Sequence, residues 1–209
     1  MKNVRIKAML LIIGSLIVLQ LSLFIIKQIF LIFIERTKYT DYIASMIGMI
    51  ILSILFILFA NKQKVALSVF PERFNKFYIL GTCVAAVLFV ASPSNYSGGL
   101  QAIMLLFYGS IVTPIFEELI FRGYIWNELN AIFEKEWITY IVSAVLFALW
   151  HLGYVDSIAF RTETGLASVM LWKAVVGLGY GIVLGALRLK TRNSYSTMLL
   201  HGVMNIFGR

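Results

Sequence analysis

Seven long apolar runs divide this sequence, and they constrain its fold more than any other feature. The runs are Met9–Ile26 (extending toward Ile34), Tyr42–Ala60, Phe77–Ala91, Leu100–Trp126, Trp137–Leu152, Met170–Leu187 and Tyr195–Phe207. A helix that crosses a membrane needs about 20 such residues. The runs lack the apolar/polar alternation of barrel strands. The sequence therefore predicts an all-α, polytopic transmembrane helix bundle of about seven spans.

The composition excludes a soluble globular protein. Of the 209 residues, 60% are hydrophobic and 13% are charged, whereas a soluble domain has about 45–50% apolar and about 25% charged residues. The net charge is +8, and the positive residues lie between the apolar runs. We therefore interpret them as a topology signal and as contacts with the lipid bilayer rather than with nucleic acid. The single cysteine, Cys83, excludes an intramolecular disulfide and a cysteine metal site.

The distribution of charge predicts an orientation. With seven spans, the segments on the side of the N-terminus carry twelve cations: Lys2, Arg5, Lys7, Lys62, Lys64, Arg73, Lys76, Arg122, Lys135, Arg188, Lys190 and Arg192. The segments on the other side, among them the uncharged loop 92–99, carry four: Arg36, Lys38, Arg161 and Arg209. Positive charge favours the cytoplasm, so we expect a multi-pass protein of the bacterial cell membrane with a cytoplasmic N-terminus. Lys27 and Lys173, near helix ends, are expected to snorkel toward the interface.

Two adjacent acids interrupt the fourth apolar run. Glu118 lies four residues before Arg122, which is the better order for an ion pair on a helix. Glu117 has no obvious partner on its own helix, and such a buried carboxylate is a natural general base or acid. Pro114 has no N–H to donate to the carbonyl of Ser110, so we expect the helix to kink or open beside the acids.

Both histidines of the chain also lie in predicted spans. Phe147 precedes His151 by four residues and Asn205 follows His201 by four, so each pair lies on one helix face. A single histidine in a span is often a packing residue, and an asparagine can join two helices by a hydrogen bond. The joint pattern instead favours function, because ionisable groups are costly in a membrane. We expect Glu117, His151, His201 and Asn205 to face one polar cavity.

At these residues the sequence resembles the CPBP family, the CAAX-protease and bacteriocin-processing intramembrane endopeptidases, which are also called Abi proteins. The family pattern has three parts, which here are Glu117-Glu118 with Arg122, Phe147 with His151, and His201 with Asn205. The resemblance covers about residues 105–207. We therefore expect about three N-terminal transmembrane helices in residues 1–99 and a catalytic membrane domain in residues 100–209.

The resemblance implies that the chain is a protease, a hydrolase whose active site lies in a helical membrane bundle. It assigns the activation of water to Glu117 and His151, and it assigns stabilisation of the oxyanion to His201 and Asn205. Supporting roles fall to the remaining motif residues, Glu118, Arg122 and Phe147.

The resemblance leaves a choice between chemistry without a metal and a zinc metalloprotease. Zn²⁺ would have Glu117, His151 and His201 as ligands and would keep one position for water. The sequence lacks the His-Glu-x-x-His motif, in which two ligands share a helix face. We therefore expect no cofactor, with zinc as the alternative.

The expected substrate is a small peptide or a membrane-anchored protein segment. Relatives in eukaryotes cleave prenylated CAAX proteins, but this short chain, rich in Ile, Lys and Asn, is typical of bacteria. Bacterial relatives are linked to bacteriocin maturation, self-immunity and peptide-pheromone processing. Two alternatives are a non-catalytic membrane immunity protein and a proton-coupled transporter, since buried Glu and His also form proton relays. No paired repeats of the transporter kind are visible.

Overall fold

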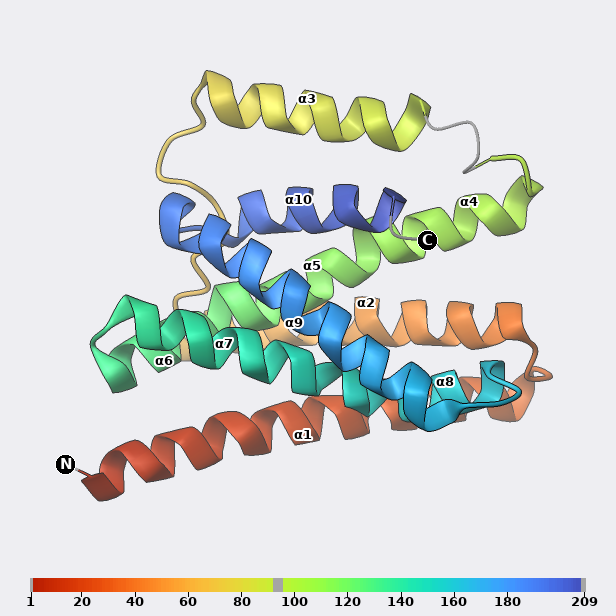
Figure 1. Ribbon diagram of the computed structural model, residues 1–209, viewed down its shortest axis with the longest axis horizontal. Coiled ribbons are helices and arrows are strands. Elements are labelled where there is room, and N and C mark those ends of the chain that lie inside the picture. The colour runs from red at the N-terminus through yellow and green to blue at the C-terminus, as the bar shows by residue number, and fades with distance from the viewer. Residues whose placement is uncertain (1, 92–95, 208–209) are drawn as a thin grey trace.

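The computed structural model describes residues 2–91 and 96–207, which form seven continuous helical rods and no strand (Figure 1). The first three rods are α1 (Lys2–Phe33), α2 (Lys38–Gln63) and α3 (Lys76–Ala91). The fourth contains α4 (Gly99–Phe107), a π turn (Tyr108–Val112), α5 (Thr113–Glu118), a second π turn (Leu119–Ile125) and α6 (Trp126–Phe133). The fifth contains α7 (Glu136–Trp150), a 3₁₀ turn (His151–Tyr154) and α8 (Val155–Arg161), and the last two are α9 (Leu166–Thr191) and α10 (Ser194–Phe207). The predicted all-α bundle is confirmed.

Five of the rods are long and apolar enough to cross a membrane. The other two described rods are shorter, with 16 residues in α3 and 14 in α10. Successive rods run in opposite directions, so their connections alternate between the two ends of the bundle, as the seven apolar runs predict (Figure 1). The fifth rod continues nine residues beyond the end of its apolar run, to Arg161. Residues 92–95 of the expected loop, and Arg209, lie outside the described residues.

The fourth rod opens beside Pro114, as the sequence predicts. The N–H of Thr113 donates to the carbonyl of Tyr108, five residues earlier. In an α-helix it would donate to the carbonyl four residues earlier. This π turn removes the need for an N–H at Pro114. A second π turn begins directly after Glu118. The two acids therefore lie on a short α-helical segment between two wider turns.

Glycine residues allow α9 to approach its neighbour α7 closely. Three of them recur at intervals of four residues: Gly177, Gly181 and Gly185. A Cβ atom at Gly181 would lie 2.9 Å from both Cα and the carbonyl oxygen of Ala144, and one at Gly177 would lie 2.7 Å from Nδ1 of His151. Small residues at this spacing are the usual means of close packing between membrane helices. The glycine face of α9 thus sets the separation of two rods that border the site.

Lys27 does not snorkel, so that prediction is wrong. Its side chain is 5% exposed and forms an ion pair with Asp156 of α8. Its Nζ atom lies 3.3 Å from Asp41 of α2 and donates to Ser157 at 2.7 Å. Arg36 contacts both carboxylates at 2.8 Å. The partners that compensate this buried charge come from two other helices, α2 and α8, and the network fastens α1 and α2 to α8.

We expect Gly181→Ala to lower the thermal unfolding midpoint. The new Cβ would meet backbone atoms of Ala144, which cannot move without the helix, and such overpacking typically costs about 1–3 kcal/mol. Gly179→Ala is the matched control, because nothing lies within 4 Å of a Cβ there. The control should be neutral or slightly stabilising, since alanine is the better helix former. Thermal unfolding in detergent measures both, and equal midpoints would contradict the close contact of α7 and α9.

Candidate active site

The two acids of α5 are among the most deeply buried side chains of the described structure. Glu117 is 1% exposed, and Glu118 and Arg122 are not exposed. The predicted ion pair is present, with Nη1 of Arg122 donating to Oε1 of Glu118 at 2.9 Å. The guanidinium also lies 4.3 Å from the ring centroid of Phe147 and donates to the carbonyl of Gly181 at 3.4 Å. Arg122 thus joins α5 to both α7 and α9.

His201 of α10 reaches both acids. Its Nδ1 atom lies 3.0 Å from Oε1 of Glu118, and its Nε2 atom lies 3.9 Å from Oε2 of Glu117. A neutral imidazole that donates from Nδ1 to a carboxylate keeps its acceptor, Nε2, on the other side. The contact with Glu118 is short enough for a hydrogen bond, whereas the contact with Glu117 is too long for one. Glu118 therefore orients His201, and Nε2 is presented to Glu117.

Two aromatic side chains that the sequence analysis did not single out bind Glu117. The hydroxyl of Tyr154 donates to Oε1 of Glu117 at 2.7 Å. The indole N–H of Trp150 lies 3.3 Å from the same oxygen and 2.8 Å from the hydroxyl of Tyr154. A sequence signal does exist, because Trp150 and Tyr154 are four residues apart and flank the histidine of the second motif. Polar-tipped aromatic residues in a span need such partners.

His151 and Asn205 have other partners. Nδ1 of His151 lies 2.8 Å from the carbonyl oxygen of Phe147, and the two rings pack edge to face at 4.9 Å. Nδ2 of Asn205 donates to the carbonyl of Gly109, in the first π turn, at 2.7 Å. Within residues 2–91 and 96–207, no hydrogen bond or ion pair joins either side chain to the two acids. That the four predicted residues share one cavity stays a prediction.

Phe147 connects the two histidines across the bundle. Its ring is fully buried and packs edge to face against His201 at 6.1 Å as well as against His151. The ring of Tyr180, on α9, contacts the other side of the site at 5.3 Å from the ring of His201. These aromatic walls keep the polar groups of the site in a low-dielectric setting, where hydrogen bonds and charges interact strongly.

A zinc ion at this site would require Glu117, His151 and His201 to turn toward one point. Among the described residues, no group of three or more His, Cys, Asp or Glu side chains is arranged to hold a metal ion. Nδ1 of His201 contacts Glu118 instead. The donor atoms, as arranged here, therefore do not assemble the zinc ligand set that the sequence offers as an alternative.

One comparison with known proteins identifies the family. A family model described as Type II CAAX prenyl endopeptidase Rce1-like matches residues 99–207, which contain all three motifs. No curated protein and no solved structure matches the chain. The match covers just over half of the chain and confirms the family resemblance. The chain belongs to the Rce1-like family of type II CAAX prenyl endopeptidases, which are intramembrane proteases.

Proposed function

We propose that this protein hydrolyses peptide bonds in the membrane, with Glu117 as the general base that activates water. The observation that carries this proposal is the position of Glu117, a buried carboxylate that forms no ion pair with a Lys or Arg of the described residues and lies beside an oriented histidine. Tyr154 and Trp150 hold one of its oxygens. The other oxygen remains available to accept a proton from water.

The charges of the cluster support acid–base chemistry. Glu118 and Arg122 form a neutral pair, and Glu117 adds a second negative charge close to them. A net charge in a low-dielectric interior is costly. One proton, held by either Glu117 or His201, makes the cluster neutral. A pair of groups that share one proton suits a reaction in which a proton first leaves water and later reaches an amine.

In the proposed reaction, water binds between Oε2 of Glu117 and Nε2 of His201. Glu117 takes a proton as the water oxygen attacks the carbonyl carbon of the substrate. For this step His201 carries a proton on both ring nitrogens, so that Nδ1 still donates to Glu118 while Nε2 donates to the oxyanion, with Asn205 as the second donor. The C–N bond then breaks, and the proton passes from Glu117 to the leaving amine. The products are a carboxylic acid and an amine, and transfer of the remaining proton of the water between them gives a carboxylate and an ammonium group.

His151 and Asn205 enter this proposal through their motifs. His151 would assist Glu117 with the attacking water, and Asn205 would be the second oxyanion donor. Each now contacts a main-chain carbonyl, that of Phe147 or of Gly109. In the proposal these hydrogen bonds exchange for contacts with the substrate when it binds, since hydrogen bonds at active sites without substrate often rearrange.

The substrate class proposed is a small peptide or a membrane-anchored segment, processed in bacteriocin or peptide-pheromone maturation or in self-immunity. The apolar rods around the site support a substrate that arrives from the membrane. The family description names prenylated CAAX substrates, so a farnesylated CAAX peptide and the same peptide without the lipid make a direct comparison. Cleavage of the second peptide by purified protein in liposomes would support the proposed class.

Glu117→Gln should reduce cleavage steeply and leave the protein folded. The amide keeps the shape of the side chain but removes the base, and general-base catalysis typically contributes about 10²–10⁴ in rate. His201→Ala should cost about 10²–10³, as for loss of one oxyanion donor. Glu163→Gln, at an exposed position, is the control and should cleave like wild type.

Cleavage at the wild-type rate by the Glu117→Gln variant would overturn the assignment of the base. Two further readouts separate the alternatives. If the variant keeps protection against a toxin although no cleavage is detected, the protein is an immunity factor. If the variant loses ion flux in liposomes and the wild type cleaves nothing, a transporter is favoured.

Chelators should leave the activity unchanged in the proposed reaction without a metal. Elemental analysis of pure, active protein should then find no stoichiometric zinc. The zinc alternative predicts the opposite, because removal of the ion would abolish activity and its return would restore it. One zinc per chain, with activity that tracks occupancy, would overturn the proposal that Glu117 and His151 activate water without a metal.

A further inference from the structure

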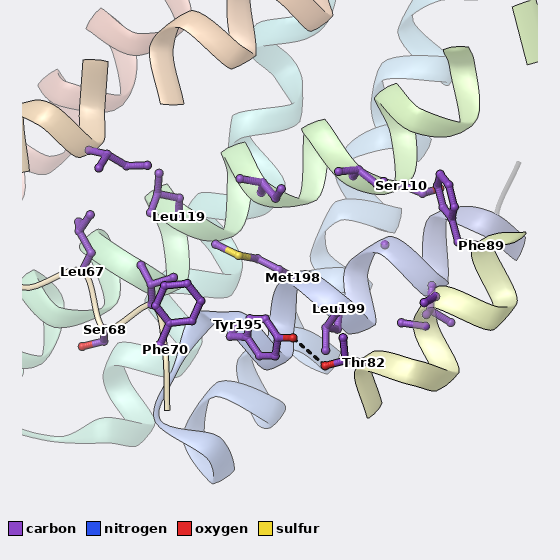
Figure 2. Close-up of a pocket in the computed structure, with 18 of the residues that line it drawn as sticks. Leu67, Ser68, Phe70, Thr82, Phe89, Ser110, Leu119, Tyr195, Met198 and Leu199 are labelled. Atoms are coloured by element: carbon purple, nitrogen blue, oxygen red, sulfur yellow. Dashed lines mark hydrogen bonds between the residues drawn. The ribbon is translucent and has the colours of Figure 1, made fainter. Parts of the chain in front are cut away.

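A large apolar groove lies outside the candidate active site. It has a volume of about 810 Å³ and runs between α3, α10 and the fourth rod (Figure 2). Leu119 lines it from the fourth rod, and its lining excludes Glu117 and His201. Thr82 of α3 and Tyr195 of α10 meet across it through their hydroxyls, 2.6 Å apart. The groove is therefore a separate site on the other side of α5 and α10.

The groove faces lipid because α3 stands apart from the rest of the bundle. No side chain of α3 is buried, and among the described elements its main neighbour is α10 (Figure 1). Twelve residues, 64–75, connect it to α2. A hollow of this size with an apolar lining is a poor site for water, because polar partners are few. Hydrocarbon is the occupant that fits it.

One end of the groove has the composition of a membrane interface. Four aromatic rings cluster there with centroids 5.3–6.5 Å apart: Phe70, Phe74, Tyr78 and Tyr195. The same segment carries four exposed cations: Lys62, Lys64, Arg73 and Lys76. Within the described residues, no ion pair engages any of these cations. Aromatic residues mark the headgroup level of a bilayer, and basic clusters beside helices bind anionic headgroups.

We propose that the groove binds one anionic phospholipid. Its acyl chains would fill the hollow behind α3, and its phosphate would lie at the cationic segment 62–76. The lipid would thereby link α3 to α5, with which it has few direct contacts, and would add to its contact with α10. Charge selects the headgroup, and the apolar lining selects the chain.

Native mass spectrometry of the delipidated full chain tests this, with phosphatidylglycerol and phosphatidylcholine of identical acyl chains as probes. We expect one phosphatidylglycerol to bind, and Lys62→Gln/Lys64→Gln to weaken it about 30-fold, by the usual contribution of two interfacial cations. Ala85→Phe, which fills the groove, should abolish binding while leaving the headgroup site intact. Lys135→Gln/Lys190→Gln, with the same charge change elsewhere, is the matched control.

Equal affinity for both lipids would overturn the proposal, since it would mean ordinary solvation by the bilayer. Equal weakening by the matched control would also overturn it. So would retained binding in the Ala85→Phe variant, or full competition by inorganic phosphate, since the acyl chain would then contribute nothing.

A different set of contacts joins α1 to the turn that carries the donors of Glu117. Gln20 donates from Nε2 to the carbonyl of Trp150 at 3.0 Å. A Cβ at Gly153 would lie 2.3 Å from the side-chain amide of Gln20, so a larger residue there would displace that amide from Trp150. Two turns further along α1, Lys27 forms its ion pair with Asp156. These contacts fix the segment 150–156 at both of its ends.

From these contacts we infer that α1 positions the catalytic base, an inference that rests on the proposed function. Trp150 is itself the first attachment point and Tyr154 lies between it and Asp156, and both side chains donate to the same oxygen of Glu117. A 3₁₀ turn has poorer hydrogen bonds than an α-helix and needs outside support. The helix α1 lies outside the segment 99–207 that the family model matches. Gln20 and Lys27 are thus positioning residues supplied by the N-terminal half.

The indole N–H signal of Trp150, assigned in ¹⁵N spectra by Trp150→Phe, reports this role directly. We expect Gln20→Leu and Lys27→Met to shift or broaden it, and to lower kcat about tenfold, as for loss of one hydrogen bond, with KM little changed. Ser15→Ala is the control, since Ser15 bonds only within α1, to Ile12. Gln20→Leu is the milder variant and serves if Lys27→Met fails to fold.

An unchanged Trp150 signal in a folded Gln20→Leu variant would overturn the positioning role. An equal shift in Ser15→Ala would do so as well. If instead the wild type cleaves no peptide while the signal responds as expected, the proposed function fails and the structural coupling stands. The two failures are therefore distinguishable.

Discussion

Two adjacent buried carboxylates served by a single arginine are the constraint on which the rest of this structure depends. Glu118 forms an ion pair with the guanidinium of Arg122, so the stabilisation of Glu117 depends on neutral hydrogen-bond donors. An unpaired charge in such an interior costs several kcal/mol. The donors come from a neighbouring rod, as Trp150 and Tyr154. The acids thereby favour particular helix contacts, and α9 provides the carbonyl of Gly181 to Arg122 while the absence of a side chain at Gly181 lets α9 pack against Ala144 of α7.

The two π turns explain how neighbouring acids serve different partners. Successive residues of a helix point about 100° apart, and so Glu117 faces the end of α7 and the 3₁₀ turn that follows it, while Glu118 faces Arg122 and His201. The π turns before and after α5 change the rotation of α4 and α6 about the helix axis, while the two acids keep their relative orientation on α5. The first of them includes Gly109, whose carbonyl takes a hydrogen bond from Asn205. π turns are frequently found at functional sites for this reason.

Local interactions of this protein were predictable from its sequence, and contacts between rods were not. Apolar runs predict rods because length and composition alone decide whether a helix suits a bilayer. The pair Glu118–Arg122 is predictable because four residues set the geometry. Tyr154 was missed because its partner, Glu117, is 37 residues away. Lys27 was misinterpreted because its carboxylates lie on two other helices, where no periodicity reveals them.

Comparison of the two buried ionic clusters shows why one is structural and the other suits catalysis. Around Lys27, three cations serve two carboxylates, since Arg36 and Arg161 also contact Asp41. Each acid there has more than one cation, so proton exchange would only remove favourable interactions. Around Glu117 the balance is reversed, with two carboxylates, one arginine and one histidine. A cluster with fewer fixed cations than acids must balance the remaining negative charge with other donors, as Tyr154 and Trp150 do for Glu117, and the proposed reaction uses this imbalance to move a proton.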